Sequence, residues 1–190
     1  MKDGREKIEE EKLVKRAIRG ESSAFGLLYD RYQPAIFRFI YLKVGHREEA
    51  EDLTHQTFLS AWQNIESFRR EGFSISSWFY RIARNKVIDY YRTKKSTLEL
   101  NRILEETLTS DSTQQAESLS QKMELGLVRK AIQSLSTEQQ DVLIMRFVEE
   151  MSYREISQVM EKNQGLIRVI QFRALRKIKK IIENGAKDNY

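Results

Sequence analysis

Apolar residues recur every three or four positions along most of this chain, which is the spacing expected of helices with one buried face. The 190 residues include one proline and eight glycines, so few positions favour the interruption of a helix. The pattern therefore predicts an all-α fold. The expected helices are about 9–19, 22–45, 48–65, 75–95 and 122–134, two that follow Ser136 and Ser152, and 165–182.

Local signals mark the ends of the first long helix. Ser22 or Ser23 is expected to cap its beginning, because a serine oxygen accepts hydrogen bonds from the free N–H groups of a first turn. Gly45 is expected to end it in the left-handed conformation that glycine adopts easily. Pro34 lies inside it and lacks an N–H group, so we expect a kink or a break one turn earlier.

The stretch 68–95 organises the rest of the chain. After a cap at Ser74 or Ser76, its helix is expected to bury Ile75, Trp78, Phe79, Ile82, Ala83, Val87 and Tyr90. The opposite side carries Arg81, Arg84, Asn85, Ile88, Arg92 and Lys95, flanked by Tyr80 and Tyr91. Cations suit phosphates, aromatic rings suit unstacked bases, and an amide reads a base edge, so this side predicts a nucleic-acid contact. The alternative is a basic, solvated surface above a good core.

The loop before that helix adds Phe68, Arg69, Arg70 and Phe73 around a glycine. Aromatic and cationic side chains on a short loop favour a place that holds a nucleotide.

The preceding helix, 48–65, exposes Asp52, His55, Gln56 and Leu59 on its outer side. These residues form either a plain solvated face or a surface for a protein partner, and the pattern leaves both open.

Charge is distributed in blocks. The net charge is +5, yet 68–95 holds eight basic and two acidic residues, and 162–180 holds seven basic residues and no acid. Residues 96–124 hold six acids and two basic residues. Two cationic blocks separated by an anionic spacer indicate two separate nucleic-acid contacts. We therefore expect two small helical domains, 1–95 and 122–190, joined by a flexible acidic linker at 96–121.

The C-terminal part has the order of a helix-turn-helix unit. Ser136 with Gln139, and Ser152 with Glu155, have the spacing of capping boxes, and Val142, Leu143, Met145 and Phe147 are expected to be core residues. A turn at 161–164 separates the short helix from a basic one at 165–182. The last helix is expected to bury its isoleucines and to direct Arg168, Phe172, Arg176 and Lys179 outward, with Val169 and Arg173 at the edge. Phe172 on this cationic side suits contact with a thymine methyl group.

These blocks together resemble the bacterial sigma factors of the extracytoplasmic-function group. The N-terminal resemblance lies in AEDLTHQTFLSAW and SFRREGFSISSWFYRIARNKVIDYYR, and the C-terminal one in AIQSLSTEQQDVLIMRFVEEMSYREISQVMEKNQGLIRVIQFRALRKI. The resemblance implies a protein that binds core RNA polymerase and directs it to promoters, with an anti-sigma factor as a further partner. Family members commonly have Gln-Glu at His55-Gln56 and a threonine at Leu166.

The resemblance also implies a role for each group of residues. Asp52, His55, Gln56 and Leu59 would bind the polymerase clamp. The minus-ten element would be captured and melted by Phe68, Arg69, Arg70, Phe73, Arg81, Arg84, Asn85, Ile88 and Arg92. The minus-thirty-five duplex would be read by Arg168, Val169, Phe172, Arg173 and Arg176.

Two other classes of function compete with this interpretation. A stand-alone helix-turn-helix regulator would bind duplex DNA without polymerase, but its N-terminal domain has no need of a basic aromatic face. An enzyme would have His46 and His55 available, with Glu51 and Asp52 near His55 at helical spacing. No phosphate-binding glycine loop or nucleophile elbow accompanies them, so we expect no enzymatic activity, no cofactor and no metal site. The charged N-terminus and the lack of a long apolar run predict a cytoplasmic protein without membrane insertion.

Overall fold

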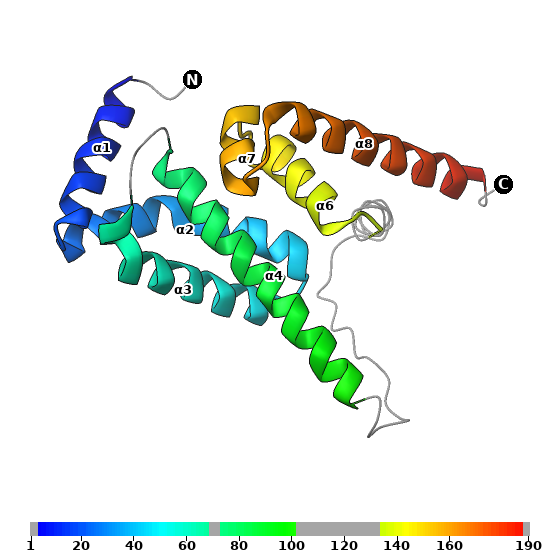
Figure 1. Ribbon diagram of the computed structural model, residues 1–190, viewed down its shortest axis with the longest axis horizontal. Helices are drawn as coiled ribbons and strands as arrows, with labels where there is room; N and C mark the ends of the chain where they lie inside the picture. The colour runs from blue at the N-terminus through cyan, green and yellow to red at the C-terminus, as the bar shows by residue number, and fades with distance from the viewer. Residues whose placement is uncertain (1–3, 69–72, 102–133, 188–190) are drawn as a thin grey trace, which may run out of the picture.

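The computed structural model describes residues 4–68, 73–101 and 134–187, and every element in them is helical (Figure 1). The order is α1 (Gly4–Ile18), α2 (Ser22–Val44), α3 (Arg47–Asn64), the short 3₁₀ turn η1 (Ile65–Ser67), α4 (Ile75–Asn101), α6 (Thr137–Leu143), the π-helical turn η2 (Ile144–Val148), α7 (Tyr153–Met160) and α8 (Gln164–Lys187). The prediction of an all-α fold is confirmed. The expected helix at 122–134 and the turn of helix around Ile103, Leu104 and Leu108 lie outside the described residues.

The N-terminal half, α1–α4, packs around aromatic side chains. Phe79 of α4 is fully buried, and its ring centroid lies 5.2 Å from that of Phe58 on α3 and 5.3 Å from that of Tyr32 on α2. The expected inner side of α4 is confirmed for Ile75, Phe79, Ala83 and Val87, which are buried. The other three expected residues are half-buried against the core: Trp78, Ile82 and Tyr90. Such a stripe fixes which side of α4 remains for other contacts.

The boundary signals of the N-terminal half are mostly confirmed. Gly45 ends α2 with φ +80°, and the Ser74 hydroxyl accepts a hydrogen bond from the Ser77 N–H at 3.0 Å at the start of α4. The expected serine cap of α2 is wrong: Glu21 occupies that position and its side chain makes no capping hydrogen bond. Helix α2 also continues through Pro34 without the expected break. The neighbours of α2 hold it in place, so packing compensates for the one hydrogen bond that proline removes.

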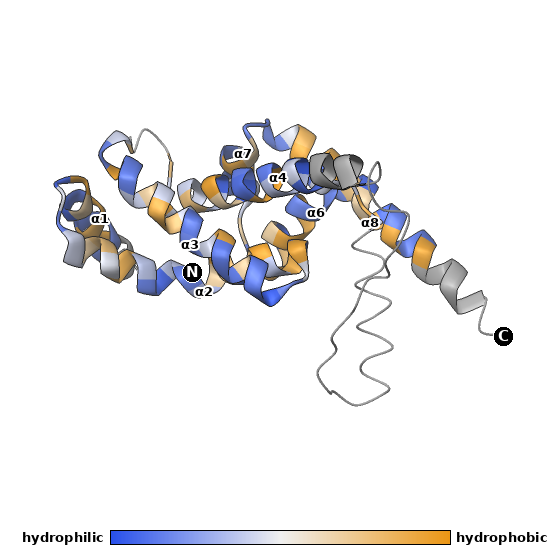
Figure 2. Ribbon diagram, turned by 90° about the horizontal axis from the view of Figure 1, so that it is seen from below, coloured by the Kyte–Doolittle hydropathy of each residue, from blue (hydrophilic) through white to orange (hydrophobic). Residues whose placement is uncertain are grey.

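The C-terminal half contains both predicted capping boxes. The Ser136 hydroxyl accepts from the Gln139 N–H, and the Ser152 hydroxyl accepts from the Glu155 N–H, with each return contact also present. Helix α8 begins at Gln164, and blue and orange alternate along it in Figure 2, as expected of a helix with one buried side. The expectation that Phe147 belongs to the core is wrong, because its side chain is 56% exposed. It lies in η2, where the backbone departs from α-helical register.

The two halves pack against each other. Helix α7 lies along α4, and η2 contacts α2, while α8 packs on α6 and α7 (Figure 1). The predicted outer position of Tyr80 is therefore wrong: its side chain is 3% exposed and lies against the C-terminal half. Among the described helices, none is long and apolar enough to cross a membrane.

Candidate nucleic-acid interface

The outer side of α4 carries the cationic residues that the sequence predicted, but much of it faces the C-terminal half. Arg84 Nε donates to the Asp141 carboxylate at 2.8 Å, and Arg81 pairs with Glu161. Asn85 is exposed, and Ile88 is half-buried. Further along, Arg92 is exposed and pairs with Asp89 at 3.1 Å on the same helix. The predicted minus-ten residues of α4 itself thus lie on its outer side, and Arg81 and Arg84 are paired with acids from elsewhere in the chain.

The described residues of the loop before α4 differ in how far they are buried. Phe68 is buried and its ring centroid lies 5.2 Å from that of Trp78, so in this conformation it packs inside the domain. Phe73 is half-buried at the mouth of a cavity. Arg69 and Arg70 lie outside the described residues.

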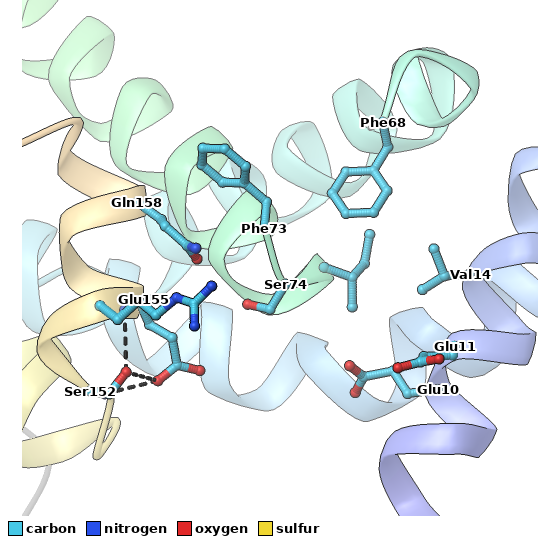
Figure 3. A pocket seen from close by; sticks show the side chains of 11 residues that line it. Glu10, Glu11, Val14, Phe68, Phe73, Ser74, Ser152, Glu155 and Gln158 are labelled. Atoms are coloured by element: carbon cyan, nitrogen blue, oxygen red, sulfur yellow. Dashed lines mark hydrogen bonds between the residues drawn. The ribbon is translucent and has the colours of Figure 1, made fainter. Parts of the chain in front are cut away.

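That cavity has a volume of about 510 Å³ and is lined by residues of α1, the start of α4 and α7 (Figure 3). Phe73 and Ser74 line it from the α4 side, and Glu10 from α1 lies across it (Figure 3). The Glu155 carboxylate, which also lines it, accepts from the Ser152 N–H at 2.8 Å and from its hydroxyl at 2.7 Å. Carboxylates of α1 and α7 line the cavity together with Arg154, so its lining as described does not favour a negatively charged nucleotide.

The predicted duplex-reading surface of α8 is open to solvent. Ile167, Ile170 and Ala174 are buried, and the exposed residues are Arg168, Val169, Phe172, Arg173 and Arg176. Phe172 is 62% exposed, although it is a large apolar side chain. At the start of the helix, the Asn163 side-chain oxygen accepts from the Leu166 N–H at 2.8 Å, which fixes the first turn.

Tyr153 of α7 orients part of this surface, a role that the sequence did not reveal. The Arg168 guanidinium lies over the Tyr153 ring, 4.7 Å from its centroid, and the Tyr153 hydroxyl donates to the Gln171 side-chain oxygen at 2.8 Å. Similarly, the Arg176 guanidinium lies 5.9 Å from the Phe172 centroid. A guanidinium held over an aromatic ring loses less conformational freedom when it binds a base.

Comparison with known proteins assigns both halves. Residues 28–97 match the family described as Sigma-70 region 2, and residues 131–180 match Sigma-70, region 4. The ECF RNA polymerase sigma-E factor of Haemophilus influenzae is 30% identical over 188 residues, which cover 94% of this chain and 96% of that protein. This chain belongs to the extracytoplasmic-function group of RNA polymerase sigma factors. As a sigma factor, it directs promoter-specific initiation of transcription, and the stand-alone regulator is not favoured.

Two further similarities agree with this membership. The ECF RNA polymerase sigma factor BldN of Streptomyces coelicolor is 34% identical over 177 residues, which cover 92% of this chain but 66% of BldN. The sigma factor RpoE, solved in complex with the anti-sigma factor NepR from Bartonella quintana, superposes with a TM-score of 0.66 at 22% identity, covering 84% of this chain and 96% of RpoE. At that identity the superposition shows a shared fold.

The predicted polymerase-binding residues of this sigma factor lie together on α3. Asp52, His55, Gln56 and Leu59 are all exposed, and Leu59 is 57% exposed. Gln56 Nε2 donates to Asp52 Oδ2 at 2.7 Å, which holds the two side chains as one polar unit. Beside them, a groove of about 510 Å³ separates α3 from α4, where Lys86 and Tyr90 line the far wall.

The two histidines of the sigma factor were the candidates for a metal site. Across residues 4–68, 73–101 and 134–187, no group of three or more His, Cys, Asp or Glu side chains converges as metal ligands would. His55 is exposed on α3, and His46 precedes that helix.

Proposed function

We propose that this sigma factor divides promoter recognition between α4 and α8 and binds core RNA polymerase through α3. The observation that carries the proposal is the exposed surface of α8, where an aromatic side chain and several cations share the outer side of a helix-turn-helix unit. A recognition helix of this kind inserts into the major groove, where base edges are distinguishable. We assign 1–95 to region 2, 96–121 to the linker and 122–190 to region 4, although α4 continues past the expected start of the linker, to Asn101.

Region 4 would read the minus-thirty-five element. Arg168, oriented by Tyr153, would donate two hydrogen bonds to a guanine, and Phe172 would contact a thymine methyl group. Val169 and Arg173 would lie against neighbouring bases, and Arg176 would reach the phosphate backbone.

Region 2 would capture the minus-ten element as a melted strand. Asn85 would bond to the edge of an unstacked base, Phe73 would stack with one, and Arg81, Arg84 and Arg92 would neutralise phosphates. Ile88, together with Arg69 and Arg70 of the preceding loop, would complete that surface. Phe68, which is buried against Trp78, would support the loop from inside the domain. Region 2 would also supply the clamp contact through Asp52, His55, Gln56 and Leu59.

The remaining partners follow from this assignment. An anti-sigma factor is a proposed partner, supported by the fold shared with RpoE, which was solved bound to one. The protein would act in the cytoplasm, where polymerase works, and would contribute recognition and strand capture without catalysis of its own.

The test is run-off transcription on a pool of genomic fragments with purified core RNA polymerase, with and without this protein. New discrete start sites that share two spaced elements are the expected result. If no new starts appear while the protein alone binds a specific duplex, the proposal that α4 and α8 recognise separate promoter elements is wrong.

A further inference from the structure

Two basic residues of α2 that the sequence analysis did not single out, Arg38 and Lys43, point toward the C-terminal half. Together with Arg84 of α4 they meet two acids, Asp141 of α6 and Glu149, which follows η2. Arg81 meets a third acid, Glu161, beyond the end of α7. The C-terminal half therefore presents carboxylates to a basic surface shared by α2 and α4.

The Glu149 carboxylate is bound by Arg38 and Tyr80 in the way that a protein binds a phosphate or another oxyanion. Arg38 donates from Nε to one carboxylate oxygen at 2.8 Å and from Nη2 to the other at 2.7 Å, and the Tyr80 hydroxyl donates to the second oxygen at 2.7 Å. The Glu149 side chain is 2% exposed, whereas that of Arg38 is 50% exposed. An arginine fork accepts a phosphate in the same two-bond arrangement as a carboxylate. Burial raises the pKa of Tyr80, as does its bond to Glu149, so the hydroxyl remains a donor.

Asp141 bridges two cations in the interior of the junction. Its carboxylate accepts from Lys43 and from Arg84, and the side chains of both Lys43 and Asp141 are fully buried. Desolvation lowers the pKa of Lys43, while Asp141 opposes that shift. A cation at this position is unfavourable without an anion, whether that anion is a carboxylate or a phosphate.

We propose that Arg38, Lys43 and Arg84 bind the sugar–phosphate backbone of the captured promoter strand, and that Asp141 and Glu149 occupy the same cations in the free chain. The inference rests on the proposed function of α4 and adds two α2 residues to its binding surface. Closure of region 4 on region 2 and strand capture then exclude each other. The duplex-reading side of α8 stays exposed in the closed chain, so only strand capture is blocked.

The direct test measures binding of the free, full-length chain to a fluorescein-labelled oligothymidine of about 20 nucleotides, which has no duplex to read. The variant Asp141→Asn/Glu149→Gln removes both anions. Its affinity is expected to rise about tenfold or more over that of the unchanged chain at low salt. Equal affinities would overturn the proposal.

The control is Glu150→Gln, which removes a neighbouring exposed negative charge and leaves the ion pairs of Asp141 and Glu149 in place. It should bind about as the unchanged chain does, since a gain as large as that of the double variant would indicate net charge alone. A milder variant, Tyr80→Phe, removes one hydrogen bond from Glu149 and keeps the ring, so a smaller gain is expected without loss of helical circular dichroism. If both variants are folded and neither binds oligothymidine more tightly than the unchanged chain, the acids do not compete with the strand for these cations.

The role of Arg38 itself is tested in the Asp141→Asn/Glu149→Gln background. Arg38→Ala should weaken oligothymidine binding there and reduce the slope of log affinity against log salt by about 0.7. An unchanged slope would exclude Arg38 from the phosphate contacts. Run-off transcription with core polymerase separates the two proposals, because specific initiation without any effect of the acid substitutions would reject only the competition.

Discussion

Lys43 and Asp141 form an ion pair whose side chains are both fully excluded from solvent, although 98 positions separate them in the sequence. The pair joins α2 to α6 and so ties the two sigma regions together. Removal of one partner from a buried pair leaves the other charge unpaired, at a cost of about 3–5 kcal/mol. In this chain Asp141 without Lys43 would keep Arg84 as its one remaining cation, and its carboxylate regains water if the two regions separate.

Lys43→Met is therefore expected to separate the regions without unfolding them. The chain has no cysteine, so Gln63→Cys on α3 and Lys180→Cys on α8, both exposed positions, provide unique sites for a pair of fluorophores. Energy transfer should fall in Lys43→Met while helical circular dichroism is retained. The double variant Lys43→Met/Asp141→Leu replaces the ion pair by apolar contact and also removes the partner of Arg84, whose side chain is 15% exposed and can turn toward solvent. It should restore much of the transfer. Low transfer in both variants would mean that closure requires the charges themselves.

Arg168→Ala should weaken promoter binding by the holoenzyme by about 1–3 kcal/mol and relax the choice of base at one minus-thirty-five position. Tyr153→Leu, which removes the ring beneath the guanidinium, should lose part of the same selectivity. Tyr153→Phe keeps that ring and loses the hydrogen bond to Gln171, so selectivity at this base should be retained. The measurement is the affinity of the holoenzyme for a set of promoters that differ by single bases in the minus-thirty-five element. A uniform loss over all variants would make Arg168 a phosphate contact.

Asn85→Ala should slow promoter melting more than it weakens binding to closed duplex. Asn85 is exposed on α4, so its truncation leaves the core unchanged. Permanganate reactivity of minus-ten thymines reports melting, and a gel shift on ice reports closed binding. An unaltered melting rate would remove Asn85 from the strand-capture surface.

Leu59→Asp should reduce the affinity for core polymerase by about tenfold, or 1.4 kcal/mol, because an apolar contact is replaced by a charge. Leu59 is 57% exposed in the free chain, so little change in its thermal unfolding is expected. Leu27→Asp, at a leucine of α2 that is 51% exposed, is the matched control. Competition against a labelled sigma factor measures both. Equal losses would show that the effect is general rather than specific to α3.

Where contacts within a few residues decide the local structure, the sequence was sufficient to predict it. Both capping boxes, Ser136 with Gln139 and Ser152 with Glu155, and the terminal glycine at position 45 depend on contacts within a few residues. The buried stripe of α4 follows from periodicity alone.

Phe147 shows where periodicity fails. The Glu149 N–H bonds to the Ile144 carbonyl oxygen at 3.1 Å, five residues back, which is the pattern of a π turn. Each extra residue in a turn rotates the following side chains away from the direction that α-helical spacing predicts. No residue type in this segment signals such a turn.

Contacts between the regions were also beyond the sequence. Tyr80 and Arg38 both reach Glu149, at separations of 69 and 111 positions, and periodicity along a helix carries no information about such a distant residue. The sequence predicted a cationic outer side of α4, and its role as a nucleic-acid contact stays a prediction. The structure adds that the protein itself supplies anions to that side.

The partly covered side of α4 and the open side of α8 would together affect how the protein behaves in a crowded cell. Single-stranded nucleic acid is exposed at replication forks and in nascent transcripts. A protein with a permanently open capture surface would bind to it nonspecifically. A chain that hides this surface until polymerase separates its regions remains available for assembly. The supply of holoenzyme then follows the amount of the sigma factor rather than the amount of unpaired nucleic acid around it.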